Sequence, residues 1–454
     1  MELQLSLKSP LHTLPSKLLS ISNLISIPNS VGVYIRAGSR NDTLESSGGA
    51  NLLRKMLLRG SASATKADLA AEVESMGARI SSDIDREITT LNVTCFKNDI
   101  GRAVALLGDA VSNPTLDSAE LELCKQEQMA EMNNLNKDGF TTSMEAVHYN
   151  AFRDHMMGQP IRGDLDTLQN ISVGDIQAFR EANYCGNNMV VVGTGNVDHD
   201  AFVQAVTSGM GGVSAEAGPG RANDDKCVYV PALLFMRDDE CYNAHCNVFY
   251  DAPSVNHEDY YSFQLLRYMI GDYEIQKNSE HVNDVANQYN ATHMILGELP
   301  DVTRQKCIYH AYSDCGLWGN WLFGNEVFAR QMNWAGLAAV TTYGGYINEV
   351  EVVRARNHMW NDLMAQKNID AANNEIGRQM IQTGRRVTRS EIAKRISHID
   401  SYFMKDLCYE YFYDSEPSFT SHGAVESLSC MGSYKYYKLN TLTTVTNMHQ
   451  NLKT

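Results

Sequence analysis

The sequence predicts an α+β protein built from two similar lobes, each a mostly antiparallel sheet covered by helices. Its 454 residues are about twice what one compact core usually covers. The predicted strands are not each followed by a crossover helix, which argues against a doubly wound sheet. A stretch rich in Gly, Ala, Ser and Asp at residues 208–226 divides the chain nearly in half and is typical of a linker.

The first half begins with a strand pattern at residues 32–39 and a helical composition at residues 50–58, which Gly60 terminates. Residues 79–95 alternate as a pair of strands around a polar turn at 85–87. Further helices are predicted at residues 66–76, 98–112, 117–136, 142–154 and 172–183, and a strand at 189–193. Helices and strands therefore mix without regular crossovers, as in an α+β lobe.

The second half repeats this order of elements. A strand pattern at residues 244–250 precedes a helical pattern at 259–270. A further strand is predicted at residues 309–317, and helices at 325–340, 346–366 and 388–396. Two halves of similar length and similar element order indicate a pseudo-repeat of one lobe.

These patterns predict the domain limits. We expect an N-terminal domain at residues 29–207, a Gly- and Ala-rich linker at 208–226 and a C-terminal domain at 227–454. Residues 1–28 are poor in acids but contain no Arg, so they resemble a transit peptide only weakly. We interpret them as a targeting segment or an N-terminal extension.

The charge of the chain excludes some classes of function. A net charge of -16 and a pI near 5.3 argue against nucleic acid as a partner, because no basic excess exists to displace counterions from phosphates. No run of eighteen apolar residues appears in the sequence. We therefore expect any membrane association to be peripheral and to depend on partner subunits.

No catalytic, metal or cofactor motif stands out. The sequence contains neither H-E-x-x-H nor H-x-x-E-H, no G-x-S-x-G elbow and no phosphate-binding loop. The ten cysteines form no C-x-x-C pair, which favours reduced thiols. Cys241, His245 and Cys246 lie close in sequence, but a second pair of ligands at normal spacing is missing. We therefore expect no cofactor and no metal.

Short motifs in both halves carry a resemblance to a known family. They are Ala37–Arg40, Gly48–Met56, Glu74–Ala78, Asp85–Glu87 and Ala130–Met132 in the first half, and Tyr312–Gly319, Arg354–Asn357, Ile376–Met380 and Gly384–Arg386 in the second. Their order over residues 30 to 430 resembles the pitrilysin (insulinase) family of inverted zinc peptidases. The resemblance is to its mitochondrial branch, which comprises the processing peptidase subunits and the core proteins of ubiquinol–cytochrome c reductase (complex III).

The departures from that family concern the metal. In H-x-x-E-H, two histidines one helical turn apart bind zinc and the glutamate acts as general base. The matching positions hold Asn51, Arg54 and Lys55, none of which can do this. Glu131 matches the distal glutamate ligand, whereas Cys124 stands at an acidic position seven residues earlier. We expect Glu131 to pair with Arg54 or Lys55 instead of a metal.

The resemblance implies a non-catalytic core subunit of complex III on the matrix side of the mitochondrial inner membrane. Its implied partners are a second core protein, cytochrome b, cytochrome c1 and the Rieske subunit. An active β-type processing peptidase is a second hypothesis, which the lost zinc positions oppose. A third is a presequence-binding α-type subunit. That subunit carries a glycine-rich loop, whereas Ile270–Asn278 has no run of glycines. The second-half motifs resemble the β-type chains more closely.

Overall fold

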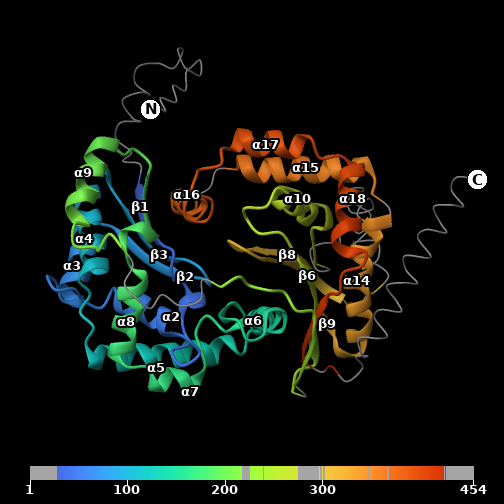
Figure 1. The fold of residues 1–454 in the computed structure, drawn as a ribbon, viewed down its shortest axis with the longest axis horizontal. Coiled ribbons are helices and arrows are strands. Elements are labelled where there is room, and N and C mark those ends of the chain that lie inside the picture. The colour runs from blue at the N-terminus through green and yellow to red at the C-terminus, as the bar shows by residue number, and fades with distance from the viewer. Residues whose placement is uncertain are drawn as a thin grey trace, which may run out of the picture.

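The computed structural model describes residues 28–216, 225–238, 240–274, 296, 299, 302–345, 347–365, 368–423 and 425. Residues 1–27 of the expected N-terminal extension, Cys430 and residues 275–278 lie outside this part of the chain. Within it, Figure 1 shows two lobes, each with a sheet and helices packed against it. The predicted α+β fold with two lobes is confirmed.

The first lobe holds a four-stranded antiparallel sheet in the order β2-β3-β1-β4. Its strands are β1 (Asn29–Ile35), β2 (Arg79–Ile84), β3 (Thr89–Cys95) and β4 (Met189–Thr194). Its helices are α2 (Gly49–Met56), α3 (Lys66–Ser75), α4 (Ile100–Ser112), α5 (Ser118–Leu135), α6 (Gly139–Phe152), α7 (Leu165–Asn170), α8 (Val173–Asn183) and α9 (His199–Gly209). All seven residues of β1 are buried, so helices cover both faces of this central strand.

The second lobe holds a six-stranded sheet in the order β5-β10-β6-β9-β8-β7, antiparallel except where β5 pairs with β10. Its strands are β5 (Leu233–Arg237), β6 (Asn243–Asp251), β7 (Asp272–Glu274), β8 (Val302–Ala311), β9 (Gly316–Asn325) and β10 (Ser418–Gly423). Its helices are α10 (Tyr260–Ile270), α14 (Ala329–Gly345), α15 (Glu349–Met364), α16 (Ile369–Thr383), α17 (Arg389–Ser397) and α18 (Ser401–Phe412).

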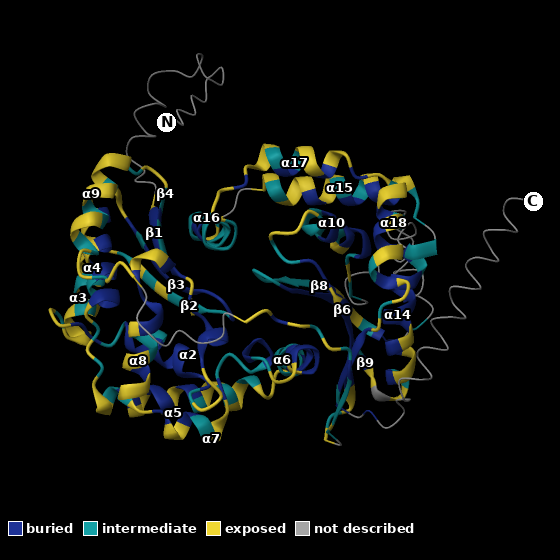
Figure 2. Ribbon diagram, viewed as in Figure 1, coloured by how far each residue is buried: buried dark blue, intermediate teal, exposed yellow. Residues whose placement is uncertain are grey.

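The two sheets share one topology. The order β2-β3-β1-β4 in the first lobe corresponds to β8-β9-β6-β10 in the second, with antiparallel pairing throughout both sets. Each lobe has its own hydrophobic core beside its sheet, and Figure 2 shows the strands and the inner faces of the helices as the buried parts. The pseudo-repeat that the order of elements predicted is thus present in three dimensions.

The lobes exchange one helix each. Helix α6 packs against β6 and β10 of the second lobe, and α16 packs against β1 and β4 of the first. Figure 1 shows both helices in the middle of the molecule, between the two sheets. On α6, Asn150 Nδ2 donates to the carbonyls of Ala232 and Phe419, both at 3.0 Å. On α16, Asn373 Nδ2 donates to the Ser30 carbonyl at 2.7 Å. The lobes therefore interlock, and the domain limits at residues 207 and 227 stay a prediction.

A glycine permits the close approach of α16. A Cβ atom added to Gly377 would lie 2.3 Å from the ring of Tyr34 on β1, far inside van der Waals contact. The hydroxyl of Tyr34 in turn lies within hydrogen-bond distance of Asn373 and Asn374 on α16. The motif Ile376–Met380 therefore has a packing reason, because only glycine lets this helix reach the first sheet.

Several elements differ from the predictions. The strand predicted at residues 309–317 is wrong: β8 ends at Ala311 and β9 begins at Gly316. The turn between them closes through a hydrogen bond from the Tyr312 amide to the Cys315 carbonyl at 2.9 Å. The helix predicted at 325–340 begins only at Ala329. The prediction missed α7, α9, α16, α18, β5, β7 and β10.

The described part of the chain has no disulfide bond and no helix that could span a membrane. Its nine cysteines are free thiols. Within the part of the chain that the structure describes, every helix is too short or too polar to cross a membrane.

Candidate functional site

Helix α2 is fixed at its start by a buried carboxylate. Asp42 Oδ2 accepts a hydrogen bond from the Gly48 amide at 3.1 Å, and Oδ1 accepts one from the Ala50 amide at 2.9 Å. Gly48 has φ of +91° and a Cβ there would lie 2.5 Å from the Arg162 carbonyl oxygen, so glycine is required. These contacts hold the side chains of the following turns in place.

Asn51 and Arg54 face each other on α2. Arg54 Nε donates to Asn51 Oδ1 at 2.9 Å, and its Nη1 donates to the Ser82 carbonyl at 3.0 Å and hydroxyl at 2.8 Å on strand β2. Burial lowers the pKa of Arg54, and the negative charges of Glu131 and Asp83 oppose that effect. The amide oxygen of Asn51 is therefore already engaged by a cation and is not free to bind a metal.

Lys55 forms the expected ion pair with Glu131. Lys55 Nζ lies 2.6 Å from Glu131 Oε1, and the Lys55 side chain is 7% exposed whereas that of Glu131 is 46% exposed. A second cation, Arg162, has its Nε 3.9 Å from Glu131 Oε2. The pairing predicted for Arg54 or Lys55 is thus confirmed for Lys55, while Arg54 hydrogen-bonds to Asn51 and Ser82.

The side chains at this place do not fit a zinc ion. Zinc in proteins is held by thiolates, imidazoles and carboxylates, usually three or four together. Here three cations, Arg54, Lys55 and Arg162, lie around the single carboxylate of Glu131. Cys124, on the same helix as Glu131, is buried, and this burial raises the pKa of its thiol. Among the described residues, no three His, Cys, Asp or Glu side chains form a group that could hold a metal.

The cysteines and histidine near the start of β6 do not converge. Cys246 Sγ donates to the Ala329 carbonyl at 3.5 Å, whereas His245 Nδ1 accepts from Trp321 Nε1 at 3.2 Å. The Cys241 thiol donates to Asp238 at 3.1 Å. Neighbouring residues of a strand point to opposite faces of the sheet, which separates His245 from Cys246. Proximity in sequence therefore does not produce a ligand set here.

A polar cluster between the lobes was not predicted. Arg40 Nη1 lies 3.1 Å from Glu87, and both Nη atoms of Arg40 lie 2.7 Å from the carboxylate of Asp314. The Ser313 amide and hydroxyl also donate to Glu87. Burial raises the pKa of Glu87. Burial also acts to raise the pKa of Asp314, but the hydrogen bonds from Arg40 and the Cys227 amide outweigh it, so that pKa is lowered.

The members of this cluster come from three motifs that carried the resemblance. Arg40 ends Ala37–Arg40, Glu87 ends Asp85–Glu87, and Asp314 lies in Tyr312–Gly319. The sequence therefore did contain a signal for the cluster, because each of these motifs includes a charged residue to which no role had been assigned. Its geometry gives these motifs a structural meaning, because a buried guanidinium with two carboxylates joins the first lobe to the β8–β9 turn of the second.

Fold and site together define two lobes of one repeated α+β topology, with a lysine–glutamate ion pair between α2 and α5 where altered zinc positions were expected. The model described as "Insulinase (Peptidase family M16)" matches residues 19–165, and the model "Peptidase M16 inactive domain" matches residues 170–296. Together they span more than half of the chain. The chain belongs to the insulinase (M16) peptidase family, and the resemblance inferred from its motifs is confirmed.

Relatives and solved structures agree with this family. The chain is 27% identical over 406 residues to "Mitochondrial-processing peptidase subunit beta" of Blastocladiella emersonii, covering 88% of this chain and 84% of the relative. It is 26% identical to the protein of the same name in Rattus norvegicus, over 88% and 81% of the two chains. A chain of the solved structure "Complex III2 from Candida albicans, Inz-5 bound" superimposes on this protein with a TM-score of 0.80 at 20% sequence identity. The superposition covers 91% of this chain and 95% of that chain. That chain has the same fold.

Proposed function

We propose that this protein is a non-catalytic core subunit of mitochondrial complex III, which keeps the peptidase fold for assembly and stability of the complex. The observation that carries the proposal is the ion pair of Lys55 with Glu131, next to the Arg54–Asn51 hydrogen bond. A site filled in this way lacks both the metal ligands and the general base of the peptidase reaction. We further propose that Asn51, Arg54, Lys55 and Glu131 are the remnants of a zinc site.

The fold supports the complex III assignment. The chain superimposes over most of its length on a chain found in complex III of Candida albicans. In this proposal the protein lies on the matrix side of the inner membrane beside a second core protein. It contacts the cytochrome b, cytochrome c1 and Rieske subunits and carries no cofactor itself. The names of its relatives favour the β-type branch, hence the position of core protein 1.

The relatives' names also favour a second candidate. In it, the chain is a processing peptidase subunit that binds presequences without cleaving them. Presequences are basic, and an acidic chain of net charge -16 would attract them electrostatically. This role needs no zinc, so the altered residues on α2 do not oppose it.

Isolation of the full chain with its partners separates the two candidates. A tagged chain is purified from mitochondrial membranes in mild detergent, and the co-purifying subunits are identified after native electrophoresis. We expect co-migration with cytochrome b and the Rieske subunit in equal amounts. Recovery as a matrix heterodimer that binds a labelled presequence peptide would instead establish the second candidate. Stoichiometric zinc together with presequence cleavage would overturn both.

A further inference from the structure

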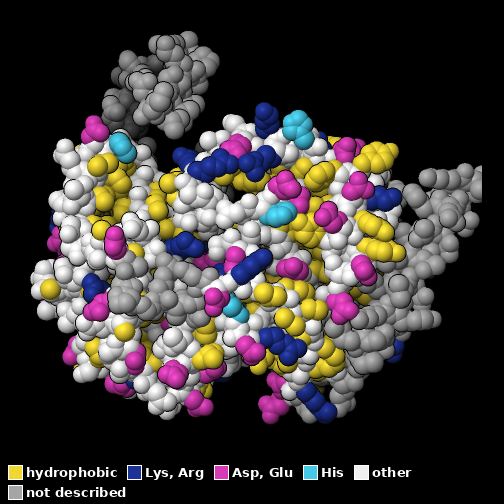
Figure 3. Space-filling model, viewed as in Figure 1, with side chains coloured by type: hydrophobic (Ala, Val, Ile, Leu, Met, Phe, Trp, Pro, Cys, Tyr) yellow, Lys and Arg dark blue, Asp and Glu magenta, His cyan; other side chains and the backbone are white. Residues whose placement is uncertain are grey.

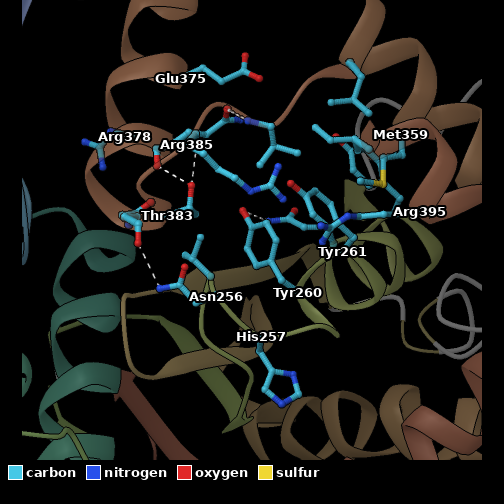
Figure 4. Close-up of a pocket in the computed structure, with 18 residues that line it drawn as sticks. Asn256, His257, Tyr260, Tyr261, Met359, Glu375, Arg378, Thr383, Arg385 and Arg395 are labelled. Atoms are coloured by element: carbon cyan, nitrogen blue, oxygen red, sulfur yellow. Dashed lines mark hydrogen bonds between the residues drawn. The ribbon is translucent and has the colours of Figure 1, made fainter. Parts of the chain in front are cut away.

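A pocket of about 450 Å³ lies in the second lobe, far along the chain from the residues on α2. It is bounded by α10, α15, α16 and α17, together with the segment that joins α16 to α17. Figure 4 shows the tyrosines of α10 on one side of it and the guanidinium groups of Arg385 and Arg395 close to them. A pocket of this size suits a ligand of cofactor or nucleotide dimensions.

The wall formed by α10 is aromatic. Tyr260 and Tyr261 have ring centroids 5.0 Å apart, and Tyr268 lies further along the same side of the pocket. Burial raises the pKa of Tyr261 and of Tyr268 to about 12, so both phenols stay neutral near pH 7. This wall therefore offers apolar ring surface with neutral hydroxyl groups rather than charge.

A cation already lies over this wall. The guanidinium carbon of Arg395 is 5.3 Å from the centroid of the Tyr261 ring. Arg385 and Arg395 share one carboxylate, since Glu391 accepts both guanidinium nitrogens of Arg385 at 2.8 Å and one of Arg395 at 2.7 Å. Two guanidinium groups on the one carboxylate of Glu391 give this group a net charge of +1. Glu375 of α16 also lines the pocket and places a second carboxylate on the side of Tyr260.

The surroundings add further positive charge. Residues 384–397 contain five basic residues and one acidic residue, a local net charge of +4 in a chain of net charge -16. The basic residues are Arg385, Arg386, Arg389, Lys394 and Arg395. Of these, Arg386, Arg389 and Lys394 are exposed and form no ion pair with the residues that the structure describes. Figure 3 shows a row of Lys and Arg side chains near the top of the molecule, where α16 and α17 lie in Figure 1.

The stability of the fold does not explain these charges. Arg389 is the first residue of α17, where the helix dipole disfavours a cation. Like charges this close also repel each other, because surface charges within about 10 Å are screened only in part. An anion bound at this rim would relieve both costs, and guanidinium groups bind phosphate oxygens in bidentate geometry.

We propose that this pocket binds a nucleotide. The base lies against Tyr261 and its neighbours, as bases stack on aromatic side chains. The phosphates extend to Arg385 and Arg395 and to the basic rim around the start of α17. None of the residues on α2 takes part, so this binding is a property separate from the proposed role in complex III.

Calorimetric titration of the full-length protein with ADP tests this assignment. We expect saturable binding of ADP, with adenosine and pyrophosphate each bound at least about tenfold more weakly, because each lacks one half of the recognised groups. Arg395→Gln and Tyr261→Leu are each expected to weaken ADP binding about tenfold. Tyr261→Leu should leave the weak binding of pyrophosphate unchanged.

A matched variant controls for the loss of a surface cation. The Arg102 side chain is 45% exposed and paired with acids in the first lobe, whereas that of Arg395 is 42% exposed. Arg102→Gln should leave ADP binding unchanged, and thermal unfolding confirms that each variant is folded. The proposal is overturned if ADP does not bind at millimolar concentration. It is equally overturned if pyrophosphate binds as tightly as ADP, or if folded Arg395→Gln and Tyr261→Leu proteins bind ADP as the unaltered protein does.

Discussion

Lys55 Nζ and Glu131 Oε1 lie 2.6 Å apart and join helix α2 to helix α5. The two partners are unequally buried, since the Lys55 side chain is 7% exposed and that of Glu131 is 46% exposed. The cost of breaking such a pair therefore depends on which partner is removed. Loss of the carboxylate leaves a buried ammonium without its counter-ion, whereas loss of the ammonium leaves a carboxylate that water still reaches.

Replacement of Glu131 should destabilise the protein more than replacement of Lys55. We expect Glu131→Ala to lower the free energy of unfolding by about 1 to 3 kcal/mol, because the Lys55 charge loses its acceptor. Lys55→Met keeps the apolar length of the side chain and should cost less than about 1 kcal/mol. Urea denaturation of the full chain measures both values.

The double variant is the control for this pair. With Lys55→Met in place, Glu131→Ala no longer leaves the Lys55 ammonium unpaired, although it still removes the longer contact with Arg162, so its additional cost should fall by at least half. Equal costs of Glu131→Ala in both backgrounds would mean that the ion pair contributes nothing to stability. The junction of α2 with α5 would then be held by other contacts.

Restoration of the family motif should restore zinc binding. The variant Asn51→His/Arg54→Glu/Lys55→His supplies two imidazoles one turn apart on α2, and Glu131 already lies within hydrogen-bond distance of the side chain at position 55. We expect roughly one Zn²⁺ per chain after dialysis, measured by mass spectrometry of the metal, against none for the unaltered protein.

A variant that keeps Lys55 controls for unspecific metal binding. Asn51→His/Arg54→Glu retains the buried ammonium beside Glu131 and should bind no zinc. If the triple variant is folded and still binds none, the residues on α2 and Glu131 are not the remnants of a metal site. The proposed history of this site would then be wrong.

The sequence was sufficient to predict the type of fold, whereas the interpretation of Asn51, Arg54 and Lys55 as altered zinc positions stays a prediction. That prediction could be made because α2 is a local element whose motif spans only nine residues. Even the pairing of Glu131 followed from charge, although Arg54 and Lys55 were equal candidates until the contact of Arg54 with Ser82 distinguished them.

The contacts between the halves could not be predicted in the same way. Asn150 on α6 and Asn373 on α16 each bond to the sheet of the other lobe, and no local pattern states which sheet a helix will cover. The motif Ile376–Met380 marked α16 without revealing that the helix was there. Its glycine matters through Tyr34, which lies more than three hundred residues earlier in the chain.

Removal of the Tyr34 hydroxyl should loosen the exchanged helix α16. Tyr34 is fully buried, and its hydroxyl lies 3.1 Å from Asn92 Oδ1, 3.1 Å from Asn373 Oδ1 and 2.8 Å from Asn374 Oδ1. Tyr34→Phe removes the one hydrogen that this hydroxyl donates. Asn374 Oδ1 still accepts a hydrogen bond from Asn92 Nδ2 at 2.8 Å, but the buried amide oxygens of Asn92 and Asn373 lose this donor, so we expect a loss of about 1 to 3 kcal/mol in the free energy of unfolding. Chemical denaturation measures this loss.

Hydrogen exchange locates the effect of Tyr34→Phe. Faster exchange is expected for the amides of α16 and no change for those of α18. Tyr402→Phe is the matched control, because Tyr402 is 79% exposed on α18 and should cost nothing measurable. Unchanged stability of Tyr34→Phe would show that water or a neighbouring amide replaces the hydroxyl.

Buried histidines should make the protein less stable as the pH falls below 6.5. Burial lowers the pKa of His148 well below its usual value and lowers the pKa of His310 and His245 to about 4. The unfolded chain takes up protons on these groups from about pH 6.5 downward, whereas in the folded chain His310 and His245 do so only near pH 4. Their contribution to the free energy of unfolding is therefore present above pH 6.5 and is lost as the pH falls from 6.5 to 4.

The variant His310→Gln measures how much the protonation of His310 contributes to this pH dependence. Its side chain does not titrate, so the dependence of the free energy of unfolding on pH between 6.5 and 4 should fall by up to about 1.4 kcal/mol per pH unit. His310 lies against His148 at a ring distance of 4.9 Å, which makes this a probe of the contact between α6 and β8. Urea denaturation at a series of pH values measures the dependence. At pH 8 the imidazole is neutral in both the folded and the unfolded chain. The change in the free energy of unfolding at that pH therefore gives the purely structural cost of the substitution. A slope that is the same in His310→Gln and the unaltered protein would mean that His310 titrates alike in the folded and unfolded chains.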